Sequence, residues 1–158
     1  MPEKVRERKP PKGLSRLFFR TPILLYRMGL GWVFGNRMLL LNHVGRKTGL
    51  PRQAVLEVAR YDKETDTYVI NAGFGDKSDW YQNILQNPEV TIRVGRRTLP
   101  VRAERLPAEA GGDIMVNFSL EHPVEARIAR MMGYGVNGTV ESWRTLGETM
   151  LFVALRPR

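Results

Sequence analysis

The chain has 158 residues, of which 42% are hydrophobic and 26% charged, values that favour one globular domain over a disordered chain. It has no cysteine, and His43 and His122 are far apart, which excludes disulfides and thiolate sites and makes any metal site unexpected. Residues 1–52 carry 12 lysines and arginines against two acidic residues, a balance of +10, whereas residues 53–158 carry 13 against 14, a balance of −1. This asymmetry predicts an anionic partner for the first third of the chain.

The N-terminal region is basic and has two interpretations. Residues 1–12 are polar and contain prolines, so we expect a basic arm without a secretory signal. Residues 13–36 have a helical pattern in which arginines alternate with apolar side chains; such a segment either packs on the core or lies as an amphipathic element on a membrane surface. Its arginines, glycines and Pro22 argue against a spanning helix. We assign residues 1–36 to an extension and 37–158 to a single domain.

The rest of the chain alternates short strands with helices. Strand patterns occur at Met38–His43, Gln53–Arg60, Tyr68–Ala72, Val90–Val94, Thr98–Glu104 and Thr149–Leu155. Helical patterns occur at about Lys77–Gln86 and at Pro107–Met132, the latter interrupted at His122-Pro123. About six mostly antiparallel strands with inserted helices predict an α+β fold built on a small barrel, and the lack of regular βαβ alternation argues against a Rossmann sheet.

One loop has the chemistry of an anion site. Gly45–Arg52 reads Gly-Arg-Lys-Thr-Gly-Leu-Pro-Arg, which places three cations within seven residues, adds the hydroxyl of Thr48, and includes glycines that allow close backbone approach. It is not a Walker loop, because Arg46 stands where that motif requires a glycine before the lysine. A solvated basic turn is the alternative interpretation of the same pattern.

A second segment has the composition of a ligand cradle. Residues 72–83 read Ala-Gly-Phe-Gly-Asp-Lys-Ser-Asp-Trp-Tyr-Gln-Asn. Glycines before a helix leave free N–H groups that suit a phosphate or a carbonyl, and Lys77 adds positive charge. Trp80 and Tyr81 offer flat surfaces, although core packing is the alternative for Trp80.

Together these segments resemble the deazaflavin-dependent nitroreductase family, whose members use coenzyme F-420. The family's G-R-K-[ST]-G-x-P-R loop is matched by Gly45–Arg52, and its W-Y-x-N-[LI]-x-x-N-P-x-V pattern by Trp80–Val90. The resemblance is strong over Met38–Glu104 and weak in the C-terminal strand. It implies a split β-barrel like that of FMN-binding proteins. It also implies an oxidoreductase that passes a hydride from the reduced deazaflavin to a quinone, an enone or a nitro compound.

The resemblance also implies a set of site residues. In the family the loop binds the coenzyme's phosphate and acidic glutamyl tail, and the turn before the helix lies along the deazaflavin. The cofactor-binding residues expected on this basis are Arg46, Lys47, Thr48, Gly49, Arg52, Ala72, Gly73, Phe74, Lys77, Ser78, Trp80 and Asn83. No catalytic side chain is assigned, because the hydride chemistry belongs to the coenzyme.

The acceptor pocket has three candidate residues. Tyr134 and Trp143 are candidates to line it, with simple packing as the alternative for each. Glu57 falls where nitro-reducing members have a tyrosine, so a lipophilic or quinone-like acceptor is at least as plausible as a nitro compound.

Three other functions stay open. The same barrel could bind FMN, although one phosphate needs fewer than three clustered cations; or it could be a non-catalytic carrier of a lipid or cofactor. Nucleic-acid binding rests on charge alone, and because no such module is recognised we expect no nucleic-acid partner. The expected partner is a small hydrophobic acceptor, and the expected assembly is a monomer or homodimer. We expect it in the cytoplasm, with the inner face of the membrane as an alternative location through residues 13–36.

Overall fold

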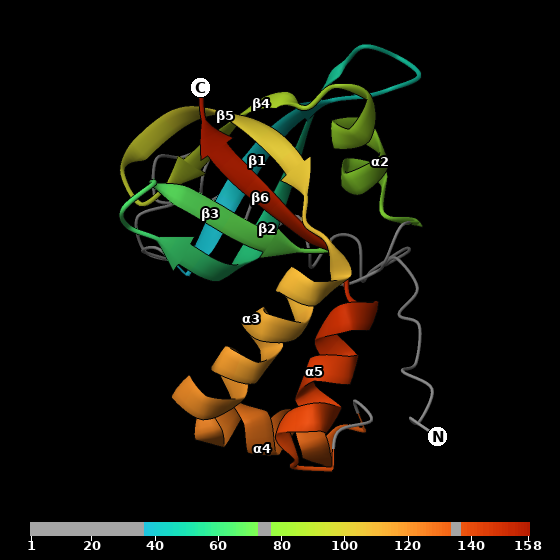
Figure 1. Ribbon diagram of the computed structural model, residues 1–158. Coiled ribbons are helices and arrows are strands. Elements are labelled where there is room, and N and C mark those ends of the chain that lie inside the picture. The colour runs from blue at the N-terminus through green and yellow to red at the C-terminus, as the bar shows by residue number, and fades with distance from the viewer. Residues whose placement is uncertain (1–36, 73–76, 134–136) are drawn as a thin grey trace.

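The computed structural model describes residues 37–72, 77–133 and 137–158. Its six strands form a closed barrel in the order β1-β2-β3-β6-β5-β4, and every neighbouring pair is antiparallel (Figure 1). The strands are β1 (Met38–Val44), β2 (Pro51–Asp62), β3 (Thr67–Asn71), β4 (Glu89–Val94), β5 (Arg97–Arg105) and β6 (Phe152–Pro157). The α+β split barrel with six strands is therefore confirmed. The expected helical N-terminal extension, residues 1–36, lies outside the described residues.

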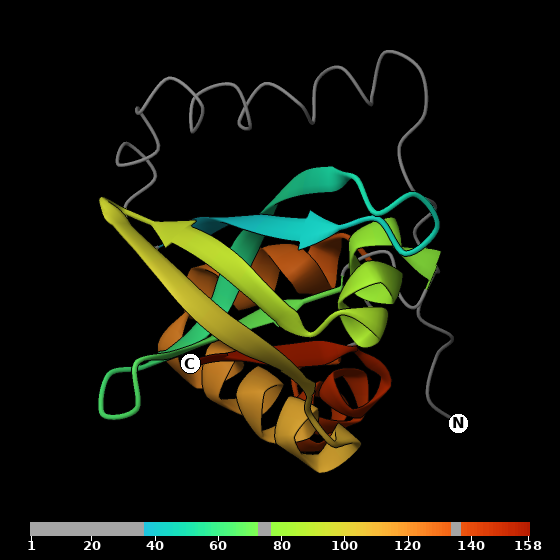
Figure 2. The ribbon, with the colours of Figure 1, turned by 90° about the horizontal axis from the view of Figure 1, so that it is seen from above.

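The barrel interior follows from the period of two in its strands. Alternate residues of β4, Val90, Ile92 and Val94, are all buried in the barrel core, which is the pattern of a strand with one inward face. Helix α2 (Asp79–Gln86) covers one end of the barrel, and its Tyr81 and Ile84 join the same core (Figure 2). Full burial of such a side chain contributes about 2 kcal/mol to folding. The packing therefore fixes α2 firmly on the barrel end.

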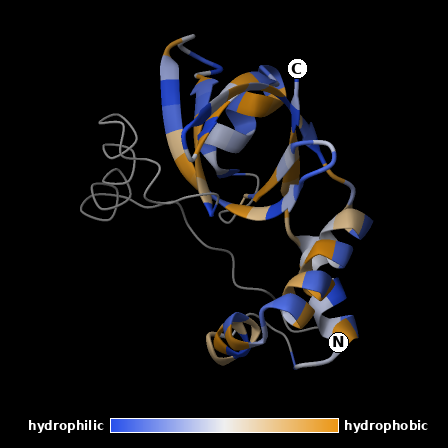
Figure 3. Cartoon of the chain, turned by 90° about the vertical axis from the view of Figure 1, so that its left-hand side faces the viewer, coloured by the Kyte–Doolittle hydropathy of each residue, from blue (hydrophilic) through white to orange (hydrophobic). Residues whose placement is uncertain are grey.

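Three further helices form a unit below the barrel, α3 (Ala108–Glu121), α4 (Pro123–Met131) and α5 (Val140–Thr149) (Figures 1 and 3). Helices α3 and α5 touch through their backbones, because a Cβ on Gly147 would lie 2.1 Å from the carbonyl oxygen of Gly111. Around this crossing, Trp143 and Leu146 of α5 pack against Val116 of α3 in a core separate from that of the barrel. None of the helices in the described ranges is long and apolar enough to cross a membrane.

The C-terminal part differs from the sequence prediction. The predicted strand Thr149–Leu155 is wrong at its start, because Thr149 ends α5 and β6 begins at Phe152. Helix α5 itself was not predicted, although Thr139 caps it by accepting a hydrogen bond from the Ser142 N–H at 3.2 Å. The predicted break between α3 and α4 at His122-Pro123 is confirmed.

Candidate functional site

The loop between β1 and β2 is folded on itself by its own hydrogen bonds. The Gly45 N–H donates to the Leu50 carbonyl at 2.9 Å, and the Gly49 N–H donates to the Gly45 carbonyl at 2.8 Å. Gly49 has a φ of +70°, and a Cβ on Gly45 would lie 2.7 Å from the Thr48 hydroxyl oxygen. The two glycines thus close the loop on itself.

Asn83 of α2 joins this loop to the helix. Its side chain is only 4% exposed, and its Oδ1 accepts hydrogen bonds from the Arg46 backbone N–H at 3.0 Å and from the Arg46 guanidinium at 2.9 Å. The loop and α2 accordingly lie side by side in both ribbon views (Figures 1 and 2). Two segments nearly 40 residues apart in sequence therefore form one surface.

His43, at the end of β1, completes the network. Its Nδ1 lies 3.1 Å from the Asn83 Nδ2, and the residue is 6% exposed. Burial, and then the positive charge of Arg52, lower the pKa of His43 to about 4, while Asp79 acts in the opposite direction. The imidazole is therefore neutral at pH 7.

The outer surface of this region is predominantly basic. Lys47 and Arg52 are exposed, as is Lys77 just before α2. The Arg46 side chain is 27% exposed, and its guanidinium lies 3.5 Å from the carboxylate of Asp79, which is 88% exposed. An ion pair this open to solvent contributes little, so an anionic ligand can compete for Arg46.

The segment between β3 and α2 contains buried polar atoms. The Asn71 Oδ1, the Ser78 Oγ and the Tyr81 hydroxyl have no hydrogen-bond partner among the residues that the structure describes. Ser78 stands at the N-cap of α2, yet its side chain makes no capping bond. Buried polar groups without partners are uncommon. Their concentration within 11 residues fits a segment that contacts a polar ligand.

The structure separates other predicted residues from this surface. Trp80 is 9% exposed and belongs to the barrel core, and Trp143 is buried in the helical core with its ring 6.0 Å from that of Phe118. Glu57 is exposed on β2, paired with Met38, about 20 Å along the strand from the loop.

Of the remaining predicted site residues, only Ala72 lies in the described part of the chain. Ala72 is buried, and its N–H donates to the Leu151 carbonyl at 2.9 Å. Gly73, Phe74 and Tyr134 lie outside the described residues. The sequence pattern indicated His43 only as a possible metal ligand, not as part of this network. The signal that could have shown its role is a histidine at the end of an apolar strand, directly before the anion loop.

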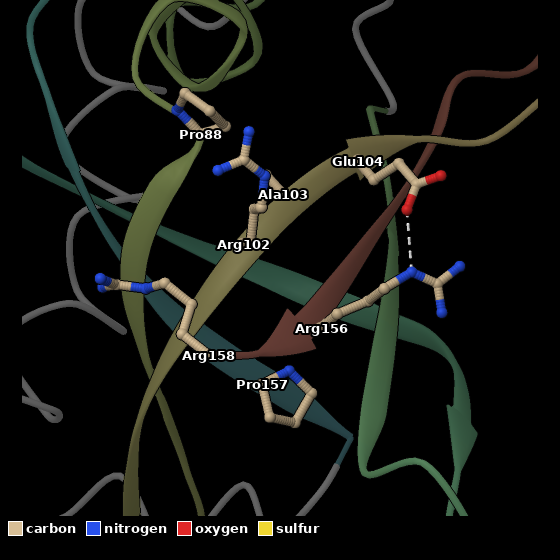
Figure 4. Close-up of a pocket in the computed structure, with 7 residues that line it drawn as sticks. All are labelled: Pro88, Arg102, Ala103, Glu104, Arg156, Pro157 and Arg158. Carbon is tan, nitrogen blue, oxygen red and sulfur yellow. Dashed lines mark hydrogen bonds and ion pairs between the residues drawn. The ribbon is translucent and has the colours of Figure 1, made fainter.

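A shallow depression on the barrel wall is a different feature. It encloses about 500 Å³ and is lined by Pro88, Arg102, Ala103, Glu104, Arg156, Pro157 and Arg158 (Figure 4). Its arginines are engaged within the protein: Arg156 pairs with Glu104 at 2.9 Å, and Arg158 donates to the Val101 carbonyl at 2.9 Å. The candidate site is the basic surface made by the loop and α2, where Lys47, Arg52 and Lys77 are exposed.

Comparison with known proteins gives one family and one fold. The profile of F420H2-dependent quinone reductases matches residues 26–124. An F420H2-dependent quinone reductase of Mycobacterium tuberculosis is 39% identical over 69 residues, which span 42% of this chain and 44%, less than half, of the relative.

Two solved structures share the architecture. An F420H2-dependent reductase superposes with a TM-score of 0.51 at 18% identity, covering 77% of this chain and 96% of its own. A pyridoxamine 5'-phosphate oxidase-related, FMN-binding protein from Nostoc punctiforme superposes with a TM-score of 0.50 at 16% identity, covering 92% of this chain and 83% of its own. At these identities the likeness establishes the fold alone.

Proposed function

Since this chain belongs to the F420H2-dependent quinone reductase family, we propose that it binds coenzyme F-420 and passes a hydride from the reduced coenzyme to a quinone. The observation that carries the proposal is the docking of the Gly45–Leu50 loop on α2 through Asn83. This docking places the cations of the Gly45–Arg52 motif beside the start of α2, the helix that carries the Trp80–Val90 motif. Membership also confirms the resemblance to deazaflavin-dependent oxidoreductases, with quinone reduction as the named activity of the family.

The residues present fit the coenzyme. Its phosphate and glutamyl tail carry several negative charges, and among the described residues Arg46, Lys47, Arg52 and Lys77 offer four cations beside the carboxylate of Asp79. The unpartnered Ser78 hydroxyl suits the polar edge of the ring system or the phosphate. FMN, with one phosphate and no acidic tail, leaves most of these cations without a role.

The protein's own part is to hold and shield the coenzyme. When bound, the reduced deazaflavin supplies a hydride from a ring carbon. The cations hold the tail, and the first turn of α2 offers backbone N–H groups of the kind that bind a phosphate. Beneath this turn, the buried Ala72 and Trp80 keep water out of the barrel end. No side chain in this arrangement needs to act as a nucleophile.

Fewer contacts support the assignment of the acceptor pocket than support that of the coenzyme site. A quinone is favoured over a nitro compound by the family's description. Trp143 packs in the helical core, and Glu57 lies far along β2, so neither supports a pocket beside the loop. Tyr134 stays the candidate acceptor contact. The basic segment 13–36 would allow the protein to collect a lipophilic quinone at a membrane surface.

A parallel titration tests this function. The purified protein is titrated with coenzyme F-420 and with FMN while tryptophan fluorescence is followed, and oxidation of the reduced coenzyme by menadione is then recorded. We expect tight binding of the deazaflavin, much weaker binding of FMN, and quinone-dependent turnover. Preference for FMN would overturn the cofactor assignment, and tight coenzyme binding without turnover of any quinone would favour a carrier.

A further inference from the structure

The hydrogen bonds around Asn83 fix the protonation of a buried histidine. The backbone N–H and the guanidinium of Arg46 can only donate, so the atom of Asn83 that faces them must be the oxygen. The amide nitrogen then faces His43, and because it too can only donate, the His43 Nδ1 must present a lone pair. The ring is therefore neutral and carries its proton on Nε2.

Resting on the proposed function, we propose that His43 is a positioning residue for coenzyme binding. Acting through Asn83, it holds the Gly45–Leu50 loop in the conformation that presents Arg46 and Lys47 to the acidic tail, and its protonation releases the loop. The sequence of contacts is short: His43 orients the amide of Asn83, and that amide binds Arg46 twice. Both His43 and Asn83 are almost fully buried, so water does not readily replace either bond.

The charged groups around His43 define the consequence of protonation. Arg52 faces it from the paired position on β2, Arg46 lies beyond Asn83 in the loop, and Asp79 approaches from α2. An imidazolium would place a donor against the Asn83 N–H₂ group, and rotating that amide would turn the same N–H₂ group toward Arg46. Either arrangement loses at least one buried hydrogen bond. The lowered pKa of His43 agrees with this preference for the neutral ring.

Two substitutions of His43 separate positioning from packing. His43→Asn keeps a hydrogen-bond acceptor at the δ position and cannot be protonated, whereas His43→Leu keeps apolar volume and removes the acceptor. The first readout is hydrogen exchange of the Arg46 amide in coenzyme-free protein at pH 7.5. We expect the protection of this amide to be retained in His43→Asn and to fall about tenfold in His43→Leu, the loss that one buried hydrogen bond implies. The reverse order would show that His43 only fills space and would overturn the proposal.

Acidification gives a second readout that does not need the leucine variant. Between pH 7 and pH 4, the protection of the Arg46 amide, corrected for intrinsic exchange, should fall in the wild type and stay constant in His43→Asn. Asp79 and Arg52 are the same in both proteins, so their effects cancel in the comparison. An identical fall in both proteins would assign the transition to another group and overturn the proposal.

Coenzyme affinity links the network to function. We expect the dissociation constant of coenzyme F-420 to rise about tenfold in His43→Leu and to stay within about threefold of the wild type in His43→Asn. If none of the three proteins binds the coenzyme while the exchange results hold, the proposed function fails and the loop network stands. If the wild type binds tightly but the variants show unchanged exchange and affinity, the function stands and the role of His43 is refuted.

Discussion

The two ends of this molecule are held together by different forces. At the barrel end, the loop of residues 45–50 rests on α2 through hydrogen bonds to one buried amide, that of Asn83. In the helical unit, α3 and α5 meet backbone to backbone at Gly111 and Gly147, with apolar side chains filling the space around them. A hydrogen-bonded loop can shift when a ligand or proton arrives, whereas a close-packed crossing has no room to change. The family profile, which ends at residue 124, contains the first region in full.

The largest expected effect is on the helical crossing. Gly147→Ala places a methyl group where the Gly111 carbonyl already lies, so we expect the free energy of unfolding to fall by about 3 kcal/mol, as overpacking costs require. Urea denaturation measures this loss. Gly112→Ala is the matched control with a smaller expected loss, because its nearest contact at 3.0 Å is the flexible Arg144 side chain. Coenzyme affinity of the folded Gly147→Ala protein should be unchanged; an undiminished stability would refute the close crossing.

The next effect is the pH dependence of stability at the barrel end. The pKa of His43 is lowered to about 4 in the folded state, from 6.5 ordinarily, so the unfolded chain takes up the proton first as pH falls. The neutral ring therefore stabilises the fold above pH 6.5, and this contribution is lost progressively toward pH 4. Relative to His43→Asn, the wild type should lose about 2 kcal/mol between pH 7 and pH 5. Parallel pH profiles in urea titrations would contradict the assigned environment.

Removal of a loop cation should weaken binding without loss of stability. Lys47→Ala or Arg52→Ala should raise the dissociation constant of coenzyme F-420 about tenfold at low salt and less at high salt, because the lost attraction is screened. Lys63→Ala serves as the control, since Lys63 is exposed in the turn at the opposite end of β2. Equal coenzyme affinity of the wild type and all three variants at low salt would show that the loop is not part of the coenzyme site.

The smallest expected effect concerns the ion pair between Arg46 and Asp79. Asp79→Asn removes the carboxylate 3.5 Å from the guanidinium and leaves a side chain of the same shape. Coenzyme binding should tighten about threefold, since an exposed pair of this kind is worth under about 1 kcal/mol. The same fluorescence titration measures it. Weaker binding would mean that Asp79 orients Arg46 rather than competing for it.

The elements whose sequence patterns are local could be predicted from the sequence. The alternation in β4, the strand before the loop and the break at His122 follow from period and turn chemistry, and each is present in the structure. Helix α5 escaped prediction because its apolar residues are sparse and Gly147 reads as a helix breaker, whereas the crossing with α3 requires it.

The other differences between prediction and structure concern residues whose surroundings depend on contacts distant in sequence. The motif predicts that Asn83 contacts the cofactor, whereas in the structure its side-chain oxygen and nitrogen form hydrogen bonds with Arg46 and His43. Glu57 lies far from the loop because the pairing of β1 with β2 places it opposite Met38. Neither register nor the direction of a buried amide is readable from spacing along one chain.

We propose that the loop cations recognise the acidic tail of the coenzyme, and a thermodynamic cycle that combines one substitution with one truncation of the ligand tests this proposal. Affinities are measured for wild type and Lys47→Ala, each with coenzyme F-420 and with the deazaflavin riboside that lacks the phosphate and glutamyl tail. We expect Lys47→Ala to weaken binding of the full coenzyme about tenfold and to leave binding of the truncated form unchanged. Equal losses for both forms, or none for the full coenzyme, would contradict it.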